Sequence, residues 1–112
     1  MFRRSAERTF THRVFVQTPV DKGHEQESLL VTYRVLDPER VEEFDHSTAK
    51  GQNDFLQAAI VNIDEILGAG DEPVQFNAKA FNAFLREEPH TRIPLIKGYF
   101  DAVNKGSGRK GN

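Results

Sequence analysis

The sequence predicts an α+β fold, in which an N-terminal antiparallel β-hairpin at 9–36 packs against about four α-helices at 37–104. Three observations support this. Apolar and polar residues alternate near the start of the chain, apolar residues recur about every 3.6 positions after Asp37, and none follows residue 104. The 112 residues have room for one domain, which we place at 1–104. The Gly-rich tail 105–112 is expected to be disordered, because it has no apolar surface to bury.

The hairpin follows from two segments of different character. Thr9–Gln17 alternates with a period of two, and Ser28–Leu36 is rich in Val, Leu, Thr and Tyr, as strands are. Between them, Thr18–Gly23 contains Pro, Asp and Gly and is expected to form a long loop. Apolar residues lie on both faces of the hairpin, Phe15 and Leu30 being opposite the expected core. That outer face is either covered within the chain or meets a partner or another copy.

The first two helices are expected between Asp37 and Leu67. Asp37 can cap a short helix that has Pro38 at its first position and ends near His46. The small, polar residues 47–51 predict a linker. The most regular apolar stripe runs over 52–67, which predicts one long helix ended by Gly68.

Two more helices are expected near the end of the chain. Residues 68–75 contain Gly and Pro and predict a loop. A helix then begins at Asn77 and must end before Pro89, whose ring disfavours helical geometry in the preceding residue. The last helix is expected from Thr91 to Val103, with Pro94 tolerated in its first turn.

The composition excludes several classes of site. There is no cysteine, and therefore no disulfide, thiolate nucleophile or cysteine-bound metal, which fits a reducing bacterial cytosol. Apolar runs are too short to span a membrane, so no membrane partner is expected. The net charge of −2 gives no general attraction to nucleic acid.

Nothing in the sequence predicts catalysis or a cofactor. The four histidines have no ligand partner at helical spacing, adjacent carboxylates do not face each other on a helix, and no glycine loop follows a strand. A binding or assembly protein remains. The alternative is a small nucleic-acid-binding regulator that uses the basic N-terminal residues. A basic tail exposed to solvent is the simpler explanation of this charge cluster. Those residues are Arg3, Arg4, Arg8 and Arg13. Steep weakening by salt would identify DNA binding.

A family resemblance covers nearly the whole chain and is carried by the segments Arg8–Thr11, Thr32–Leu36, Phe55–Val61, Asp64–Ile66, Glu72–Phe76, Pro89 and Ile96–Val103. In this order the segments resemble the tail assembly chaperones of long-tailed bacteriophages and prophages. The chain departs from the family pattern at Asn62-Ile63, where Gly-Trp is common, and at Gly98, where Ala is usual.

The resemblance implies a protein that binds the tape measure protein and assists polymerisation of the tail tube protein, with homo-oligomers possible. A frameshifted longer product is common in such systems, and Lys110–Asn112 could be encoded by a slippery site, which the gene sequence tests. A minor structural tail component would instead persist in purified particles. A chaperone of this kind needs an apolar groove for an amphipathic helix. The candidate lining residues, for each of which a place in the internal core is the more common explanation, are Phe81, Phe84, Leu85, Tyr99 and Phe100.

Overall fold

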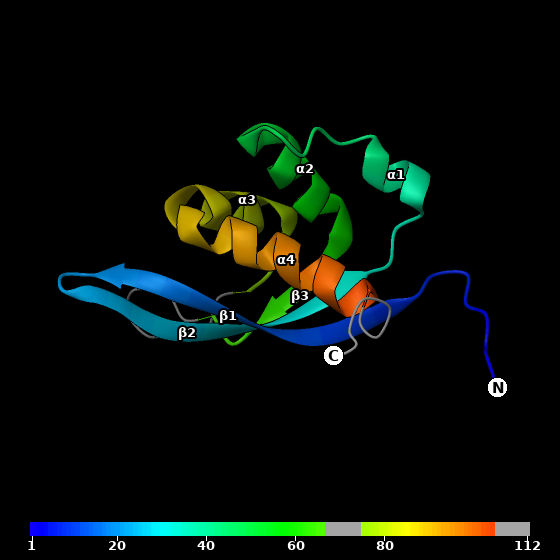
Figure 1. Ribbon diagram of the computed structural model, residues 1–112, viewed down its shortest axis with the longest axis horizontal. Coiled ribbons are helices and arrows are strands. Elements are labelled where there is room, and N and C mark those ends of the chain that lie inside the picture. The colour runs from blue at the N-terminus through cyan, green and yellow to red at the C-terminus, as the bar shows by residue number, and fades with distance from the viewer. Residues whose placement is uncertain (67–74, 105–112) are drawn as a thin grey trace.

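A three-stranded antiparallel sheet, covered by helices on one face, forms the frame of the protein (Figure 1). The computed structural model describes residues 1–66 and 75–104. The strand order is β1-β2-β3, so β1 and β3 are the edges of the sheet. The α+β prediction, with its N-terminal hairpin and four helices, is confirmed. The expected Gly68 cap, most of the loop at 68–75 and the tail 105–112 lie outside the described residues.

The hairpin is longer and tighter than predicted. β1 (Thr9–Val20) pairs with β2 (Gly23–Arg34) along its full length, which leaves a turn of only Asp21 and Lys22. The expected long loop from Thr18 is therefore wrong. Pro19 is tolerated within β1 because this is an edge strand, where a missing N–H can face away from the neighbour.

The predicted helix at 52–67 is also wrong in its second half. The helix ends at Ala59, and β3 (Ile60–Asp64) follows and pairs with β2. The pairing skips one residue, Val61, which forms a β-bulge. Because of the bulge, Ile60 and Ile63 are both buried although they lie three residues apart. In the sequence this spacing imitates one face of a helix.

Side-chain caps set the starts of three helices. Asp37 caps α1 (Pro38–Glu42), which ends earlier than the predicted His46. Thr48 caps α2 (Ala49–Ala59) by accepting a hydrogen bond from the Gly51 N–H, so part of the predicted linker at 47–51 is helical. Each cap supplies an acceptor for a backbone N–H that the first turn cannot satisfy.

The last helices lie close to their predicted positions. Asn77 caps α3 (Ala78–Glu87), which ends before Pro89 as expected. A single 3-10 turn, η1 (Pro89–Thr91), leads into α4 (Arg92–Val103), and Pro94 lies in the first turn of α4. Pro89, the first residue of η1, and Pro94, in the first turn of α4, therefore both occupy positions that need no helical N–H bond.

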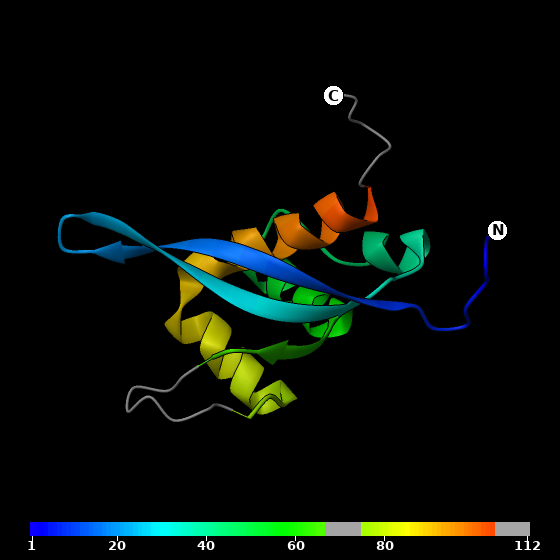
Figure 2. The ribbon, with the colours of Figure 1, turned by 90° about the horizontal axis from the view of Figure 1, so that it is seen from below.

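The core lies between the sheet and the helices, and only one face of the sheet is covered. Seen from below, the strands lie in front of the helices (Figure 2). Phe15 points to this open face and is 56% exposed, so the described residues do not cover it. The fully buried side chains with the largest volumes are Tyr33, Tyr99, Phe55, Phe81 and Leu56.

Two tyrosines join α4 to the sheet by hydrogen bonds inside this core. The Tyr33 hydroxyl donates to the Leu95 carbonyl at 2.7 Å, and the Leu36 N–H donates to the Tyr99 hydroxyl at 2.9 Å. A Cβ on Gly98 would lie 2.9 Å from the Tyr33 hydroxyl oxygen. The close approach of α4 to β2 therefore accounts for glycine at this position.

Tyr33→Phe is expected to lower the free energy of unfolding by about 1 kcal/mol at neutral pH, the usual contribution of one hydrogen bond. Burial raises the pKa of Tyr33 above its ordinary value. Stability should thus fall as pH rises above about 10, where the unfolded chain ionises but the folded chain does not. This alkaline loss should be smaller in the variant. Urea unfolding at pH 7 and pH 10.5 checks both effects, and an unchanged variant at both would contradict the buried hydrogen bond.

Candidate functional site

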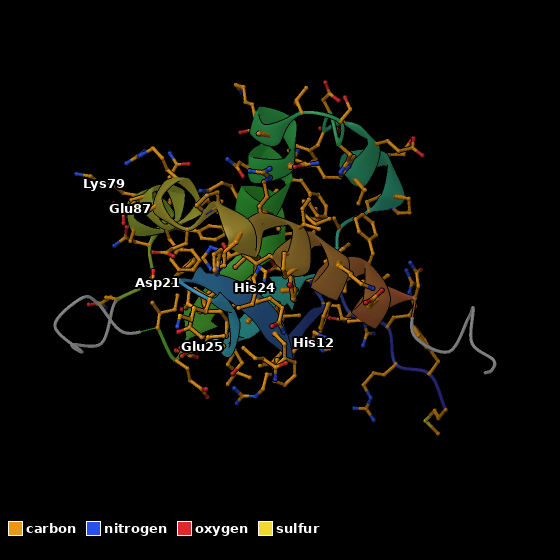
Figure 3. All side chains as sticks on the ribbon, turned by 60° about the vertical axis from the view of Figure 1, so that its left-hand side comes forward. His12, Asp21, His24, Glu25, Lys79 and Glu87 are labelled. Carbon is orange, nitrogen blue, oxygen red and sulfur yellow. The ribbon has the colours of Figure 1, made fainter. Side chains whose placement is uncertain are left out.

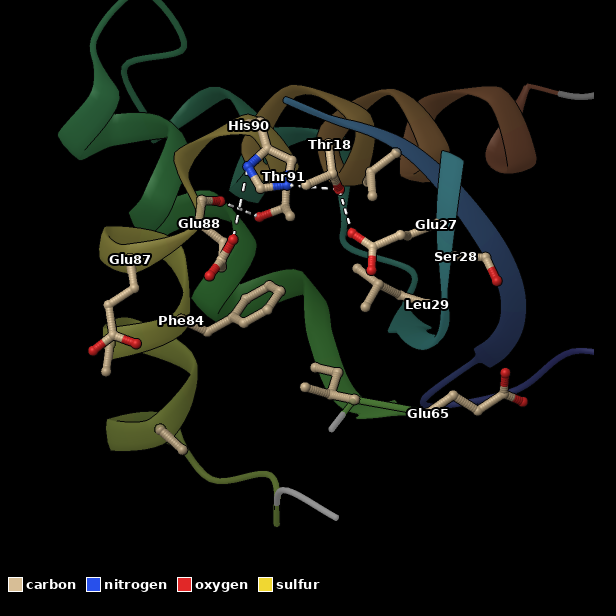
Figure 4. Close-up of a pocket in the computed structure, with 14 residues that line it drawn as sticks. Thr18, Glu27, Ser28, Leu29, Glu65, Phe84, Glu87, Glu88, His90 and Thr91 are labelled. Carbon is tan, nitrogen blue, oxygen red and sulfur yellow. Dashed lines mark hydrogen bonds and ion pairs between the residues drawn. The ribbon is translucent and has the colours of Figure 1, made fainter. Parts of the chain in front are cut away.

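A groove of about 650 Å³ lies between the outer half of the hairpin, α3 and η1 (Figure 4). Three parts of the sequence form it: the paired strands β1 and β2, the end of β3, and the helical segment at 80–91. Each wall is fixed by elements that the core holds in place. The lining residues are Val16, Thr18, Glu27, Ser28, Leu29, Glu65, Ile66, Ala80, Ala83, Phe84, Glu87, Glu88, His90 and Thr91.

The floor of the groove is apolar. Val16 and Leu29 are buried and lie on the face of the hairpin that meets the helices. Across from them, the Phe84 ring points from α3 toward β2 (Figure 4). Phe84 and Ile66 pack against the core but are only partly buried. An apolar side chain placed here would therefore exchange water for contacts with these four residues.

The rim of the groove is acidic. Glu27, Glu65, Glu87 and Glu88 line it, and no lysine or arginine does so among the described residues. Arg13 lies nearby and donates two hydrogen bonds to Glu65, at 2.9 and 3.1 Å. These bonds lower the pKa of the Glu65 carboxyl, so Glu65 stays charged at neutral pH. The carboxylates of the other three glutamates leave the rim net negative.

Polar contacts hold the two walls of the groove in register. His90 Nε2 lies 3.2 Å from the Thr18 hydroxyl, which in turn donates to the Glu27 carboxylate. On the other side, the Thr91 hydroxyl donates to the Glu88 carbonyl at 2.7 Å. A link between η1 and the hairpin therefore closes one end of the groove, and Figure 4 shows it as dashed lines.

The structure separates the five residues predicted to line a partner groove. Phe81, Leu85 and Tyr99 are buried in the core. Phe84 lines the groove described above. Phe100 belongs to a different part of the molecule, stacked on Phe55 with ring centroids 5.5 Å apart. The predicted residues of α3 and α4 therefore do not line one shared groove. Both helices pack against α2.

Sequence patterns did not indicate most of the groove. Val16 and Leu29 carried only the apolar pattern of strands, and Glu27 carried no signal, because only the pairing of β1 with β2 places it beside Thr18. Glu87 and Glu88 could have been found, since an acidic pair at the C-terminal end of an amphipathic helix opposes the helix dipole. Such a cost indicates a role other than helix stability.

Other chemistry-bearing residues are dispersed over the molecule. Asp21, His24 and Glu25 lie at the hairpin tip, apart from Lys79 and Glu87 on α3 (Figure 3). Within residues 1–66 and 75–104, no group of three or more His, Asp or Glu side chains could hold a metal ion. No helix in these same ranges is long and apolar enough to cross a membrane.

The basic residues of the alternative hypothesis do not form one surface. Arg13 is paired with Glu65, on the outer side of the sheet. Arg8 donates to the Arg3 carbonyl and lies over the Phe2 ring, 5.5 Å from its centroid. The positive charges are therefore partly engaged within the chain.

Comparisons of this chain with protein family models, with curated proteins and with solved structures found no match. The functional argument therefore rests on the geometry of the groove. The groove combines an apolar floor with an acidic rim.

Proposed function

We propose that this chain is an assembly chaperone that holds a segment of a partner protein in the groove between the hairpin and α3. By resemblance, the partner is the tape measure protein of a long-tailed bacteriophage, held while the tail tube protein polymerises around it. The observation that carries this proposal is the combination of an apolar floor at Val16, Leu29 and Phe84 with a rim of glutamates.

The two parts of the groove would contribute differently to binding. Burying apolar surface contributes about 25 cal/mol per Å², so a few apolar side chains supply most of the affinity. The glutamates at the rim attract lysine and arginine and repel phosphate and carboxylate, which gives selectivity and a faster encounter. A chaperone of this type would therefore prefer segments in which apolar residues lie beside basic ones.

Phe84→Asp is expected to weaken binding of the tape measure protein by about tenfold or more, because a carboxylate replaces the apolar floor. The measurement is copurification of the two coexpressed proteins, followed by titration of the purified partner. Ile93→Asp is the matched control, since Ile93 is an apolar residue 53% exposed on α4 and lies outside the groove. Equal affinity for both variants, each folded by circular dichroism, would contradict the proposed site.

The gene neighbourhood provides an independent test of the phage assignment. A tail tube gene upstream and a very long gene with helical periodicity downstream are expected. An unrelated operon would contradict the assignment to tail assembly, although it would leave the groove as a binding site to be tested by itself.

The alternative prediction, a nucleic-acid-binding regulator, is separated from the chaperone by reversal of charge. Arg3→Glu with Arg4→Glu would abolish DNA binding and leave partner binding intact. Glu87→Lys with Glu88→Lys would do the opposite, weakening partner binding. Because the rim is acidic, partner binding also has a component that salt screens, so charge reversal discriminates better than salt alone.

A further inference from the structure

One edge of β2 has no neighbouring strand over half its length. β2 extends from Gly23 to Arg34, but β3 pairs only with its residues Leu30–Tyr33. Among the described residues, no strand pairs with Gly23–Leu29 on that side. Such an edge presents free N–H and C=O groups, which favour the addition of another strand.

β3 stops because the backbone turns at Glu65. This residue has a φ of 65°, in the left-handed region that residues other than glycine seldom adopt. The two hydrogen bonds from Arg13 hold the Glu65 side chain against the outer face of the sheet. The line of β3 is thus interrupted at a defined point, and within residues 1–66 and 75–104 nothing pairs with the edge of β2 beyond that point.

The groove lies at this open edge. Neighbouring residues of a strand point to opposite faces, yet Ser28 and Leu29 both line the groove. The groove thus borders β2 at Ser28 and Leu29 and continues to Glu65 and Ile66, directly after the end of β3. Figure 4 shows Phe84 and Glu87 of α3 on the opposite side of this space.

The charges along the edge select the kind of strand that could be added. Glu27 lies two residues from Leu29 and on the same face. Its carboxylate accepts a hydrogen bond from the Thr18 hydroxyl and keeps a negative charge beside any strand placed there. An inward-facing charge of this kind protects an edge from apolar strands. A strand that carries lysine or arginine opposite Glu27 would avoid the free-energy cost of covering an unpaired carboxylate, because the two side chains would form an ion pair.

We propose that the partner binds by adding a short extended segment to the edge of β2 at Glu27–Leu29. In this segment an apolar side chain faces Leu29 and Phe84, and a lysine or arginine two residues away faces Glu27. The inference rests on the proposed function of the groove and specifies its partner: a basic, extended segment recognised partly through its backbone.

The test uses a synthetic heptapeptide with the sequence Thr-Val-Thr-Lys-Thr-Lys-Thr. It is titrated against the full chain by fluorescence anisotropy. A series of peptides carries one N-methyl group each, at successive backbone amides. In an added strand alternate N–H groups point to the neighbour, so methylation should weaken binding about tenfold at every second position. At the intervening positions the change should stay below about twofold, because those N–H groups face away from β2. A uniform effect along the peptide would overturn strand addition.

Charge variants provide a second measurement. Glu27→Lys should weaken the heptapeptide about tenfold, whereas Glu39→Lys, an exposed residue of α1 outside the groove, should leave it unchanged. Failure of this inference can be distinguished from failure of the proposed function. If Phe84→Asp weakens the tape measure protein but methylation shows no alternation, the groove stands and strand addition falls. If Phe84→Asp has no effect, the proposed site itself falls.

Discussion

Phe55→Ala is expected to lower the free energy of unfolding by about 4 kcal/mol, near the upper range for a large-to-small substitution in a protein core. Phe55 is fully buried on α2. Its ring meets Tyr99 edge to face with centroids 5.2 Å apart and stacks on Phe100 at 5.5 Å. Phe44 and His46 pack on its other sides. Alanine would leave a cavity bounded by two rings on α4 and two on the segment between α1 and α2, and the backbone of these two parts limits how far the rings can close it.

Urea unfolding followed by circular dichroism measures this effect. The matched control is Phe15→Ala, the same substitution on the open face of the sheet, where the expected change is below about 1 kcal/mol. Similar losses in the two variants would contradict the position of Phe55 at the centre of the aromatic cluster. A loss below about 1 kcal/mol for Phe55→Ala would contradict it directly.

The sequence predicted the parts of the fold that depend on local signals. The alternation in β1, the cap at Asp37, the helix start near Asn77 and the helix end before Pro89 each need only a few neighbouring residues. β3 was missed because its identity depends on pairing with β2, far away in sequence. Because Val61 is bulged out of the pairing, the two buried residues Ile60 and Ile63 lie three positions apart in sequence, a spacing that also suits a helix. Only the partner strand distinguishes the two.

The candidate site was less predictable for the same reason. Of the five residues expected to line a groove, only Phe84 lines the groove between the hairpin and α3. Apolar spacing identifies the buried face of a helix, but it does not show which side chain on that face remains partly exposed. The acidic rim combines Glu27, Glu65 and Glu87, which meet only through the pairing of strands and the packing of α3. No local pattern connects them.

Contacts between distant parts of the chain also hold the boundary of the groove in place. Arg13 binds Glu65 where β3 ends, and the link from His90 to Thr18 fixes η1 against the hairpin. Both contacts lie at the boundary of the groove rather than in the core. Substitutions in the core should therefore change the free energy of unfolding, whereas substitutions at the rim should change binding with little effect on stability.

Gly51→Ala gives a prediction in which two physical effects have opposite signs. Gly51 lies in the first turn of α2, and helix propensity alone would make alanine more stable by about 1 kcal/mol. However, a Cβ on Gly51 would lie 1.9 Å from the Asp45 carbonyl oxygen and 2.6 Å from its carbon. Both atoms belong to the backbone of the segment before the Thr48 cap, so no side chain can move aside.

We therefore expect Gly51→Ala to lower the free energy of unfolding by about 3 kcal/mol, since relief of the clash requires a shift of the backbone. Lys50→Ala is the control, because Lys50 is exposed in the same turn and its substitution tests propensity without the clash. Urea unfolding of both variants decides between the two effects. A Gly51→Ala variant as stable as the parent would show that the segment at Asp45 does not pack on α2 as described. A destabilised variant would show that glycine is required there by the close approach of Asp45, against the propensity of the helix that contains it.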